Sequence, residues 1–369
     1  MKVDNPYRLI ISGGGTGGHI YPAIAIAKAF CLRYPKAEVL FVGAKGKMEM
    51  TSVPQAGYKI IGLWISGFVR GKIFPNLLLP FKIIISLFVA LKVVKQYKPH
   101  VAIGTGGYAS VPMMMAAIFW RIPSLLQEQN SFPGIANKLF AKRAKRICVA
   151  YSDMGVFFPP SKISLTGNPI RKDIIDIANK RSEALNKFNF YNSKNTLLVL
   201  GGSGGASTIN ESVFMKLDQI ISSGTQLIWQ TGNGYYSGVH QRLEGKDLSN
   251  IRIFGFLTEM DLAYSVADVV ISRAGAIAIS ELCIAKKAII LVPSPNVAED
   301  HQTKNAMALS LQEAAIVVRD EEAKEKMIPQ ALALINDRPK CNVLIDNISK
   351  LGRPNATEEI IDEIEKLLK

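Results

Sequence analysis

The chain contains two similar stretches, each an apolar strand that opens into a glycine loop and then a helix. They read LIISGGGTGGH at residues 9–19 and LLVLGGSGGAS at residues 197–207. This is how a Rossmann-like βαβ unit begins, with a loop that approaches the ligand and a helix directly behind it. A chain that begins such a unit twice is expected to form two domains, each with its ligand site at the carboxyl ends of its strands.

Apolar strand-like segments alternate with helical patterns after both stretches. The first series continues through EVLFVG, VAIGTGG, SLLQEQ and RICVA, and the second through QLIWQTG, IRIFGF, VVISRAG, AIILVPS and AAIVVRD. This alternation is typical of parallel sheets covered by helices. We predict an α/β fold of two Rossmann-like domains, at residues 1–168 and 169–345, whose parallel sheets face a central cleft. Apolar residues at helical spacing predict a last helix within residues 346–369. The pattern allows it to pack on either domain, and we expect it to pack back on the first.

The composition and charge of the chain disfavour several classes of function. The four cysteines are far apart and form no C-x-x-C pair, so neither a disulfide framework nor a thiolate zinc site is indicated. The first residues lack the pattern of a secretory signal, so we expect a cytoplasmic protein. The net charge of +14 favours polyanionic partners. No basic tail or aromatic-basic interleaving is present, which disfavours nucleic acid.

A third glycine cluster, GTGGYAS at residues 104–110, also follows a strand and precedes a helix. Glycine permits positive φ and lets backbone N–H groups approach a phosphate, and a helix that starts there favours an anion. Each loop alone is equally compatible with a turn that needs glycine for packing. Three such loops at strand ends favour phosphate binding.

A dinucleotide cofactor is disfavoured by the residue at the end of the second strand. An NAD-binding domain carries Asp or Glu there to hold the ribose hydroxyls. In EVLFVGAKGK the position is Gly43, followed by Ala44 and Lys45. The acid expected of an NAD-dependent dehydrogenase is therefore absent, which disfavours that function.

His19 ends the first glycine loop at a helix start. The positive end of a helix disfavours imidazolium, and a neutral ring in a phosphate-binding cleft is a plausible general base for a hydroxyl nucleophile. The alternative is a histidine that only caps or packs.

The second half contains a polar constellation between residues 273 and 305. SRAGAIAISE leads into a helix with Glu281 in an early turn, where a carboxylate can accept both hydroxyls of a ribose or serve only as a favourable helix-start charge. EDHQTKN, at residues 299–305, suits a hydroxyl-rich ligand but is a poor metal site. The chain has no D-x-D pair, so we expect loop N–H groups and Arg171 to neutralise a diphosphate.

Seven motifs together resemble the MurG family of N-acetylglucosaminyltransferases, in the same order and over essentially the whole chain. They are GGTGGHIYPA (14–23), GTGGYASVP (104–112), QEQNSFPGIANK (127–138), TGNPIR (166–171), GGSGGA (201–206), SRAGAIAISE (272–281) and EDHQTKNA (299–306).

The resemblance implies the GT-B glycosyltransferase fold with a deep cleft between the domains. It implies inverting transfer of N-acetylglucosamine from UDP-N-acetylglucosamine to the C4 hydroxyl of the muramoyl sugar of lipid I, which gives lipid II for peptidoglycan synthesis. The family acts at the cytoplasmic face of the cell membrane, without a cofactor or a nucleotide-bound metal. It serves cell shape and division, so other cell-wall synthesis proteins are possible partners.

The same resemblance assigns site residues by motif. His19 is the candidate base, Glu281 is expected on the ribose, and Gln302 and Asn305 are expected on the sugar hydroxyls. Tyr108 and Glu128 are alternatives on the acceptor side, and the contribution of His301 stays open. The other expected substrate contacts are Thr16, Gly17, Gly18, Asn130, Arg171, Ser203, Phe256, Leu257, Ala276, Ile277, Ala278, Ile279 and Ser280.

The basic, apolar stretch at residues 68–98 then acquires a function. Its lysines, Lys72, Lys82, Lys92 and Lys95, are interleaved with Ile, Leu and Phe, as in a helix that lies in an anionic membrane interface. The alternative is a core helix with snorkelling lysines.

Two rival functions also stay open: a GT-B enzyme that glycosylates another lipid such as diacylglycerol, and a non-catalytic nucleotide-sugar binding protein.

Overall fold

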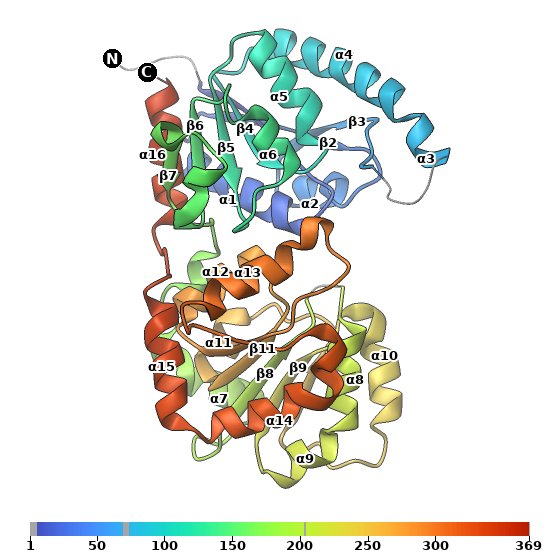
Figure 1. Ribbon diagram of the computed structural model, residues 1–369, viewed down its shortest axis with the longest axis vertical. Coiled ribbons are helices and arrows are strands. Elements are labelled where there is room, and N and C mark those ends of the chain that lie inside the picture. Colours follow the sequence, from blue (N-terminus) through green and yellow to red (C-terminus); the bar gives the residue numbers. More distant parts are fainter. Residues whose placement is uncertain (1–5, 69–73, 203, 369) are drawn as a thin grey trace. The chain divides into compact units, whose positions relative to one another are not determined.

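The computed structural model describes residues 6–68, 74–202 and 204–368 and divides the chain into two compact units (Figure 1). Unit 1 consists of Met1–Ile170 and Asn355–Lys369, and unit 2 of Arg171–Pro354. The boundary expected after residue 168 lies just before this division. Residues 346–354, which we expected with the last helix, belong to unit 2.

Unit 1 is built on a parallel sheet with strand order β3-β2-β1-β4-β5-β6-β7. The order reverses between the neighbouring strands β1 and β4, of which β4 is the central strand of the sheet. Strands β3 and β7 lie at the sheet edges and were not predicted from the sequence. The strands are β1 (Arg8–Gly13), β2 (Glu38–Ala44), β3 (Lys59–Leu63), β4 (Val101–Gly106), β5 (Ser124–Glu128), β6 (Arg146–Val149) and β7 (Ile163–Leu165).

Helices cover both faces of this sheet, as its fully buried central strands require. Leu9 and Ile11 of β1 pack with α1 (Gly17–Arg33) and α16 (Ala356–Leu368), whereas Ile10 faces the side of α4 (Leu79–Tyr97) and α5 (Ser110–Phe119). The shorter helices of unit 1 are α2 (Glu49–Gln55), α3 (Phe74–Leu77), α6 (Ile135–Phe140), η1 (Ser152–Val156) and η2 (Pro160–Lys162).

Unit 2 repeats the architecture with strand order β10-β9-β8-β11-β12-β13, again parallel throughout. This is the Rossmann strand order, with its reversal between β8 and β11. All the strands of this second series coincide with segments named from the sequence. They are β8 (Thr196–Leu200), β9 (Gln226–Gln230), β10 (Ile251–Phe254), β11 (Val269–Ser272), β12 (Ala288–Leu291) and β13 (Ile316–Val317).

The core of unit 2 joins Leu197 and Val199 of β8 and Trp229 of β9 to side chains of three helices, α8 (Ser207–Met215), α14 (Ala323–Ile335) and α15 (Arg338–Ser349). Trp229 is fully buried, and its indole N–H donates to Asn210 Oδ1 at 3.0 Å, so the ring carries no unsatisfied polar group. The helices of unit 2 are η3 (Lys172–Ile174), η4 (Ala178–Lys180), α7 (Arg181–Phe188), α8 (Ser207–Met215), α9 (Leu217–Ser222), α10 (Asn233–Arg242), α11 (Met260–Val266), α12 (Ala276–Ala285), η5 (Ala298–Asp300), α13 (His301–Ser310), η6 (Asp320–Glu322), α14 (Ala323–Ile335) and α15 (Arg338–Ser349).

The last helix, α16, returns to unit 1 and lies against α1 (Figure 1). Its apolar stripe, Ile360, Ile361 and Ile364, is fully buried in the core that α1 shares with β1. At the C-terminal end of α1, Arg33 forms ion pairs with three carboxylates of α16, at 2.5–3.1 Å. The partners are Glu358, Asp362 and Glu365. Since these pairs are partly exposed, the stripe supplies most of the docking energy. None of the described helices is long and apolar enough to cross a membrane.

We predict that Ile361→Ala lowers the free energy of unfolding of unit 1 by about 2–5 kcal/mol, because it leaves a cavity under α16. Glu359→Ala, on the same helix, should change it by about 0.5 kcal/mol or less. Hydrogen exchange measured by mass spectrometry checks this, since peptides of α1 and β1 should lose protection in the first variant only. Equal protection in both variants would contradict the role of the stripe.

Candidate active site

Three loops of unit 1 meet at the carboxyl ends of neighbouring strands. They follow β1, β4 and β5, and the first two flank the point where the strand order reverses. In open α/β sheets this is where ligands bind. The loops touch: a Cβ on Gly107 would lie 2.3 Å from the Gly14 carbonyl oxygen. Only glycine fits this contact, so packing explains Gly107 without reference to a phosphate.

His19 occupies the first turn of α1, half-buried against the loop after β4. A Cβ on Gly106 would lie 3.1 Å from ring atoms Cε1 and Nδ1, and one on Gly107 would lie 3.1 Å from Cδ2. The glycines therefore make room for the imidazole. Its Nδ1 lies 3.1 Å from Oε1 of the buried Gln129, directly after β5. The ring is thus positioned by two loops that are distant in sequence.

Glu49 binds the backbone of the first glycine loop, a role that was not predicted from the sequence. This fully buried carboxylate accepts from the N–H of Gly15 at 3.2 Å and from that of Ala44 at 3.0 Å. Gly15 has φ +86°, and a Cβ on Gly14 would lie 2.2 Å from Glu49 Oε1. The Gly15 amide is therefore committed to a protein carboxylate. The acid sought at position 43 is present six residues later, but it binds backbone rather than ribose.

Thr16 joins this loop to α1, and Gly17 and Gly18 begin the first turn of the helix. Thr16 is the exposed N-cap, and its side chain makes no capping hydrogen bond. Gly18 is exposed as well. The His19 N–H donates to the Thr16 carbonyl at 3.2 Å, so the N–H groups of Gly17 and Gly18 are the ones suited to an anion or a hydroxyl.

Glu128 and Tyr108, the two alternatives on the acceptor side, both contact the glycine loops or the loop that follows β5. Glu128 accepts from the N–H groups of Asn130 and Gly134, each at 3.1 Å, and from Asn137 Nδ2 at 2.8 Å, so its carboxylate closes the loop that holds Asn130. Tyr108 packs its ring against Gly15, where a Cβ would lie 3.0 Å from Cε1. Burial and the nearby Glu49 raise the pKa of Tyr108. Both residues shape the loops around His19.

In unit 2 the expected donor residues gather at the start of α12, behind β11. Gly275 is the N-cap, without a side-chain cap, and Ala276, Ile277 and Ala278 form the first turn. Ile279 is buried and its N–H is already bonded to the Gly275 carbonyl. The Ser280 hydroxyl donates to the Ala276 carbonyl at 3.0 Å. The backbone N–H groups of the first turn, at Ala276, Ile277 and Ala278, are suited to bind an anion. Ser203 lies outside the described residues.

Glu281 lies in the second turn of α12 with its carboxylate largely buried. Arg171 Nε is 3.6 Å from Oε1, and the Tyr264 hydroxyl donates to Oε2 at 3.4 Å. Burial raises the pKa of Glu281 to about 7, Arg171 opposes this and Asp173 adds to it. The structure thus brings Arg171 and Glu281, which are distant in sequence, to one place.

Gln302 connects two loops of unit 2 through one oxygen. Its Oε1 accepts from the N–H of Ala274 at 3.2 Å and that of Ser294 at 2.9 Å. The opposite end of the carboxamide, Nε2, is therefore the end available to donate to a ligand. Asn305 is buried, and its Nδ2 donates to the Ala274 carbonyl at 3.4 Å.

The remaining expected contacts follow β10 and β12. Phe256 is half-exposed, whereas Leu257 is buried and its N–H donates to Gln230 Oε1 at 3.0 Å. A backbone contact from Leu257 to a ligand would have to use its carbonyl. His301 is the first residue of α13, and its Nε2 lies 3.6 Å from Oε2 of Glu299 in the preceding η5.

Two Rossmann-like units, each with polar loops at the carboxyl ends of its parallel strands, make up the fold of the GT-B class of glycosyltransferases. Residues 9–149 match the N-terminal domain of glycosyltransferase family 28, and residues 196–360 match its C-terminal domain. The chain therefore belongs to glycosyltransferase family 28 and, within it, to the MurG family that its motifs resemble.

Full-length relatives have closely similar sequences. The UDP-N-acetylglucosamine--N-acetylmuramyl-(pentapeptide) pyrophosphoryl-undecaprenol N-acetylglucosamine transferase of Cytophaga hutchinsonii is 50% identical over 100% of this chain and 99% of its own. The protein of the same name from Parabacteroides distasonis is 49% identical over 98% of both. Crystalline MurG of Acinetobacter baumannii is 29% identical, with a TM-score of 0.79 over 98% of this chain and 100% of its own. The calicheamicin glycosyltransferase CalG4, at 13% identity and a TM-score of 0.70 over 99% of this chain and 98% of its own, shares the fold.

We predict a pH dependence of stability that originates at Glu281. Its folded-state pKa of about 7 lies above the ordinary 4.5, so the folded protein holds a proton that the unfolded chain releases. The free energy of unfolding of unit 2 should therefore fall as pH rises from 4.5 to 7, and then level off. Glu281→Gln cannot ionise, so its stability relative to the parent protein should increase over this window. Urea titrations at pH 5 and pH 8 measure this, with the exposed Glu244→Gln as control. A Glu281→Gln difference that is the same at both pH values would contradict the assignment.

Proposed function

We propose that the chain transfers N-acetylglucosamine from UDP-N-acetylglucosamine to the C4 hydroxyl of the N-acetylmuramoyl sugar of undecaprenyl-pyrophosphoryl-MurNAc-pentapeptide, with inversion, to form lipid II and UDP. The observation that carries the proposal is the imidazole of His19 at the strand-order reversal of unit 1, held through one nitrogen by Gln129. The names of the full-length relatives support the choice of substrates.

Unit 2 is the proposed donor side. The N–H groups at the start of α12 and the guanidinium of Arg171 are suited to the diphosphate, and the Glu281 carboxylate to the ribose hydroxyls. Gln302 would donate from Nε2 to a sugar hydroxyl, because its oxygen is committed to two backbone N–H groups. We also place Asn305 on the sugar, Phe256 and Leu257 beside the uracil, and Ser203 on the diphosphate.

Unit 1 is the proposed acceptor side. His19 takes the proton from the C4 hydroxyl as the oxygen attacks C1 of the donor sugar. The C1–O bond to UDP breaks in the same displacement, and the electron pair leaves with the diphosphate. The protein therefore has two tasks, which are to accept one proton and to stabilise the leaving charge. Thr16, Gly17, Gly18 and Asn130 surround the base and orient the sugars.

The test is transfer of radiolabel from UDP-N-acetylglucosamine to a lipid I analogue. We predict product with the parent protein and a fall in kcat of about 10²–10⁴-fold in His19→Ala, with unchanged UDP binding by calorimetry. His240→Ala, at a histidine of unit 2 on α10, should keep full activity. Label on diacylglycerol instead would favour a different lipid glycosyltransferase. UDP binding with no transfer to either acceptor would favour a nucleotide-sugar binding protein.

We further propose that unit 1 binds the anionic cytoplasmic face of the cell membrane as a peripheral protein. Residues 50–152 contain thirteen lysines and arginines and one acidic residue, the buried Glu128. This segment therefore holds almost the entire net charge of +14. Such a concentration of positive charge is attracted to anionic lipid headgroups.

An exposed apolar face accompanies this charge on α4. Its inner side, including Ala90 and Val94, is buried, but its outer side is not, so α4 is not a core helix. Lys92 and Lys95 are exposed, Lys82 donates to Ser66 Oγ at 3.0 Å, and Lys72 lies outside the described residues. The exposed apolar residues on or next to α4 are Leu77, Leu78, Phe81, Ile84, Ile85, Phe88 and Val89.

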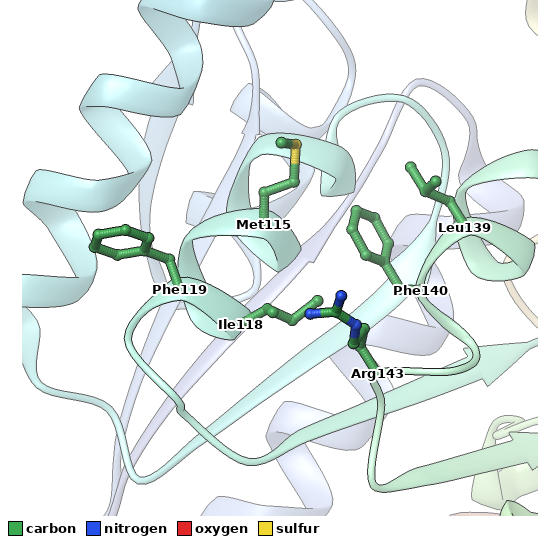
Figure 2. A pocket seen from close by; sticks show the side chains of 6 residues that line it. All are labelled: Met115, Ile118, Phe119, Leu139, Phe140 and Arg143. Carbon is green, nitrogen blue, oxygen red and sulfur yellow. The ribbon is translucent and has the colours of Figure 1, made fainter.

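A groove between α5 and α6 adds to this surface. It has a volume of about 490 Å³, and Figure 2 shows its apolar lining with the guanidinium of Arg143 beside it. Lys142 and Lys145, next to Arg143, are exposed. An apolar groove beside cations suits lipid chains under anionic headgroups. Its lining residues are Met115, Ile118, Phe119, Leu139, Phe140 and Arg143.

We predict that Phe88→Glu weakens binding to vesicles of anionic phospholipid by about tenfold or more, since it removes an inserted ring and adds a repelled charge. Leu311→Glu, at a site 80% exposed on unit 2, is the matched control and should bind like the parent protein. Vesicle sedimentation measures both. Activity on a water-soluble acceptor should be the same in both variants. Unchanged vesicle binding of Phe88→Glu would remove the membrane proposal.

A further inference from the structure

A chain of buried carboxamides in unit 1 ends at His19. Asn168 Nδ2 donates to the main-chain carbonyl of Gln129 at 3.0 Å, and Gln127 Nε2 donates to Asn168 Oδ1 at 2.9 Å. Gln129 Nε2 donates to the Thr105 carbonyl at 2.9 Å and contacts Gln127 Oε1. Gln129 Oε1 then faces His19 Nδ1 at 3.1 Å. The three amide side chains are at most 2% exposed.

The orientation of each amide follows from the one before it. A main-chain carbonyl can only accept, so the end of Asn168 that faces the Gln129 carbonyl must be Nδ2. Its Oδ1 then faces Gln127 Nε2, and Gln127 Oε1 faces Gln129 Nε2. The opposite orientation of Gln129 would place its oxygen against the carbonyls of Thr105 and Gln127, without a proton between them. The carboxamide end next to the imidazole is therefore an oxygen.

An oxygen at this position determines which ring nitrogen carries the proton. Gln129 Oε1 can only accept, so His19 Nδ1 must donate. In the neutral ring the other nitrogen, Nε2, is then an unprotonated acceptor. The glycines at 106 and 107 hold the ring in contact with their loop, which limits its rotation away from Gln129.

We infer that Gln129 is a positioning residue that fixes His19 in the tautomer with its proton on Nδ1, so that Nε2 is free to take the proton of the acceptor hydroxyl. The inference rests on the proposed function in one respect, which is the use of Nε2 as the base. The effect resembles that of the acid in a Ser-His-Asp triad, where loss of the correct tautomer lowers kcat by about 10⁴-fold. Here the orienting group is a neutral amide.

The first test is the ¹⁵N NMR spectrum of the full chain labelled at its four histidines, with His19→Gln used to assign the ring. At pH 8 the His19 nitrogens should show the Nδ1–H tautomer. Gln129→Met removes the acceptor at similar size and should give a mixture or the Nε2–H tautomer. Gln129→Glu should keep Nδ1–H, because one carboxyl oxygen replaces the amide oxygen. An Nε2–H tautomer in the parent protein would overturn the inference, and this result needs no folded variant.

The second test separates positioning from structural damage. Gln129→Met should lower kcat by about tenfold or more while KM for UDP-N-acetylglucosamine stays within twofold, and Gln129→Glu should recover part of kcat. Gln55→Met, at an exposed position of unit 1, should match the parent protein. An unchanged kcat in Gln129→Met would also overturn the inference. If the parent protein forms no lipid II, the proposed function fails, whereas the NMR spectrum still decides the tautomer.

Discussion

The contact between the loops after β1 and β4 is the constraint on which the unit 1 site depends. Gly107 meets the Gly14 carbonyl so closely that a Cβ would lie 2.3 Å from it, and Gly13 approaches the Thr105 side chain to 1.9 Å by the same measure. A side chain at position 107 would force a loop backbone to move, and one at position 13 would displace the Thr105 side chain. Because the loops touch, the first turn of α1 lies beside the backbone of residues 106 and 107, and the imidazole of His19 packs there.

Unit 2 also has a close contact between two glycine loops, those after β8 and β9. Gly232, after β9, approaches Gly205, after β8, so that a Cβ would lie 2.4 Å from the Gly205 backbone. The chemistry of the two units nevertheless differs. Unit 1 places an imidazole, that of His19, next to a carboxamide, whereas unit 2 buries a carboxylate, Glu281, next to Arg171. Duplicated topology thus provides two loop clusters, and the polar residues at the strand ends decide what each can bind.

Local sequence pattern was sufficient for the main features of the fold, and long-range packing explains what it missed. Strand-loop-helix starts at residues 9–19 and 197–207 predicted both sheets, because periodicity and glycine chemistry act over a few residues. The edge strands β3 and β7 were missed, since β3 is only half-buried and β7 has three residues. Glu49 was missed because its partner, the Gly15 N–H, lies 34 residues away. Gln129 was within a quoted motif, but only the folded loops bring it to His19.

A neutral amide beside His19 is consistent with the charge balance of the whole loop cluster. Two carboxylates of this cluster are held by donors: Glu49 by two backbone N–H groups, and Glu128 by backbone N–H groups and Asn137. A third carboxylate, at position 129, would face the Thr105 carbonyl, where the amide now donates, and would add negative charge to a site proposed for a diphosphate-bearing acceptor. An amide orients the ring with an oxygen and satisfies the carbonyl with its nitrogen. One uncharged side chain therefore both accepts from the imidazole and donates to the Thr105 carbonyl. A glutamate at this position could do both only as the protonated carboxylic acid.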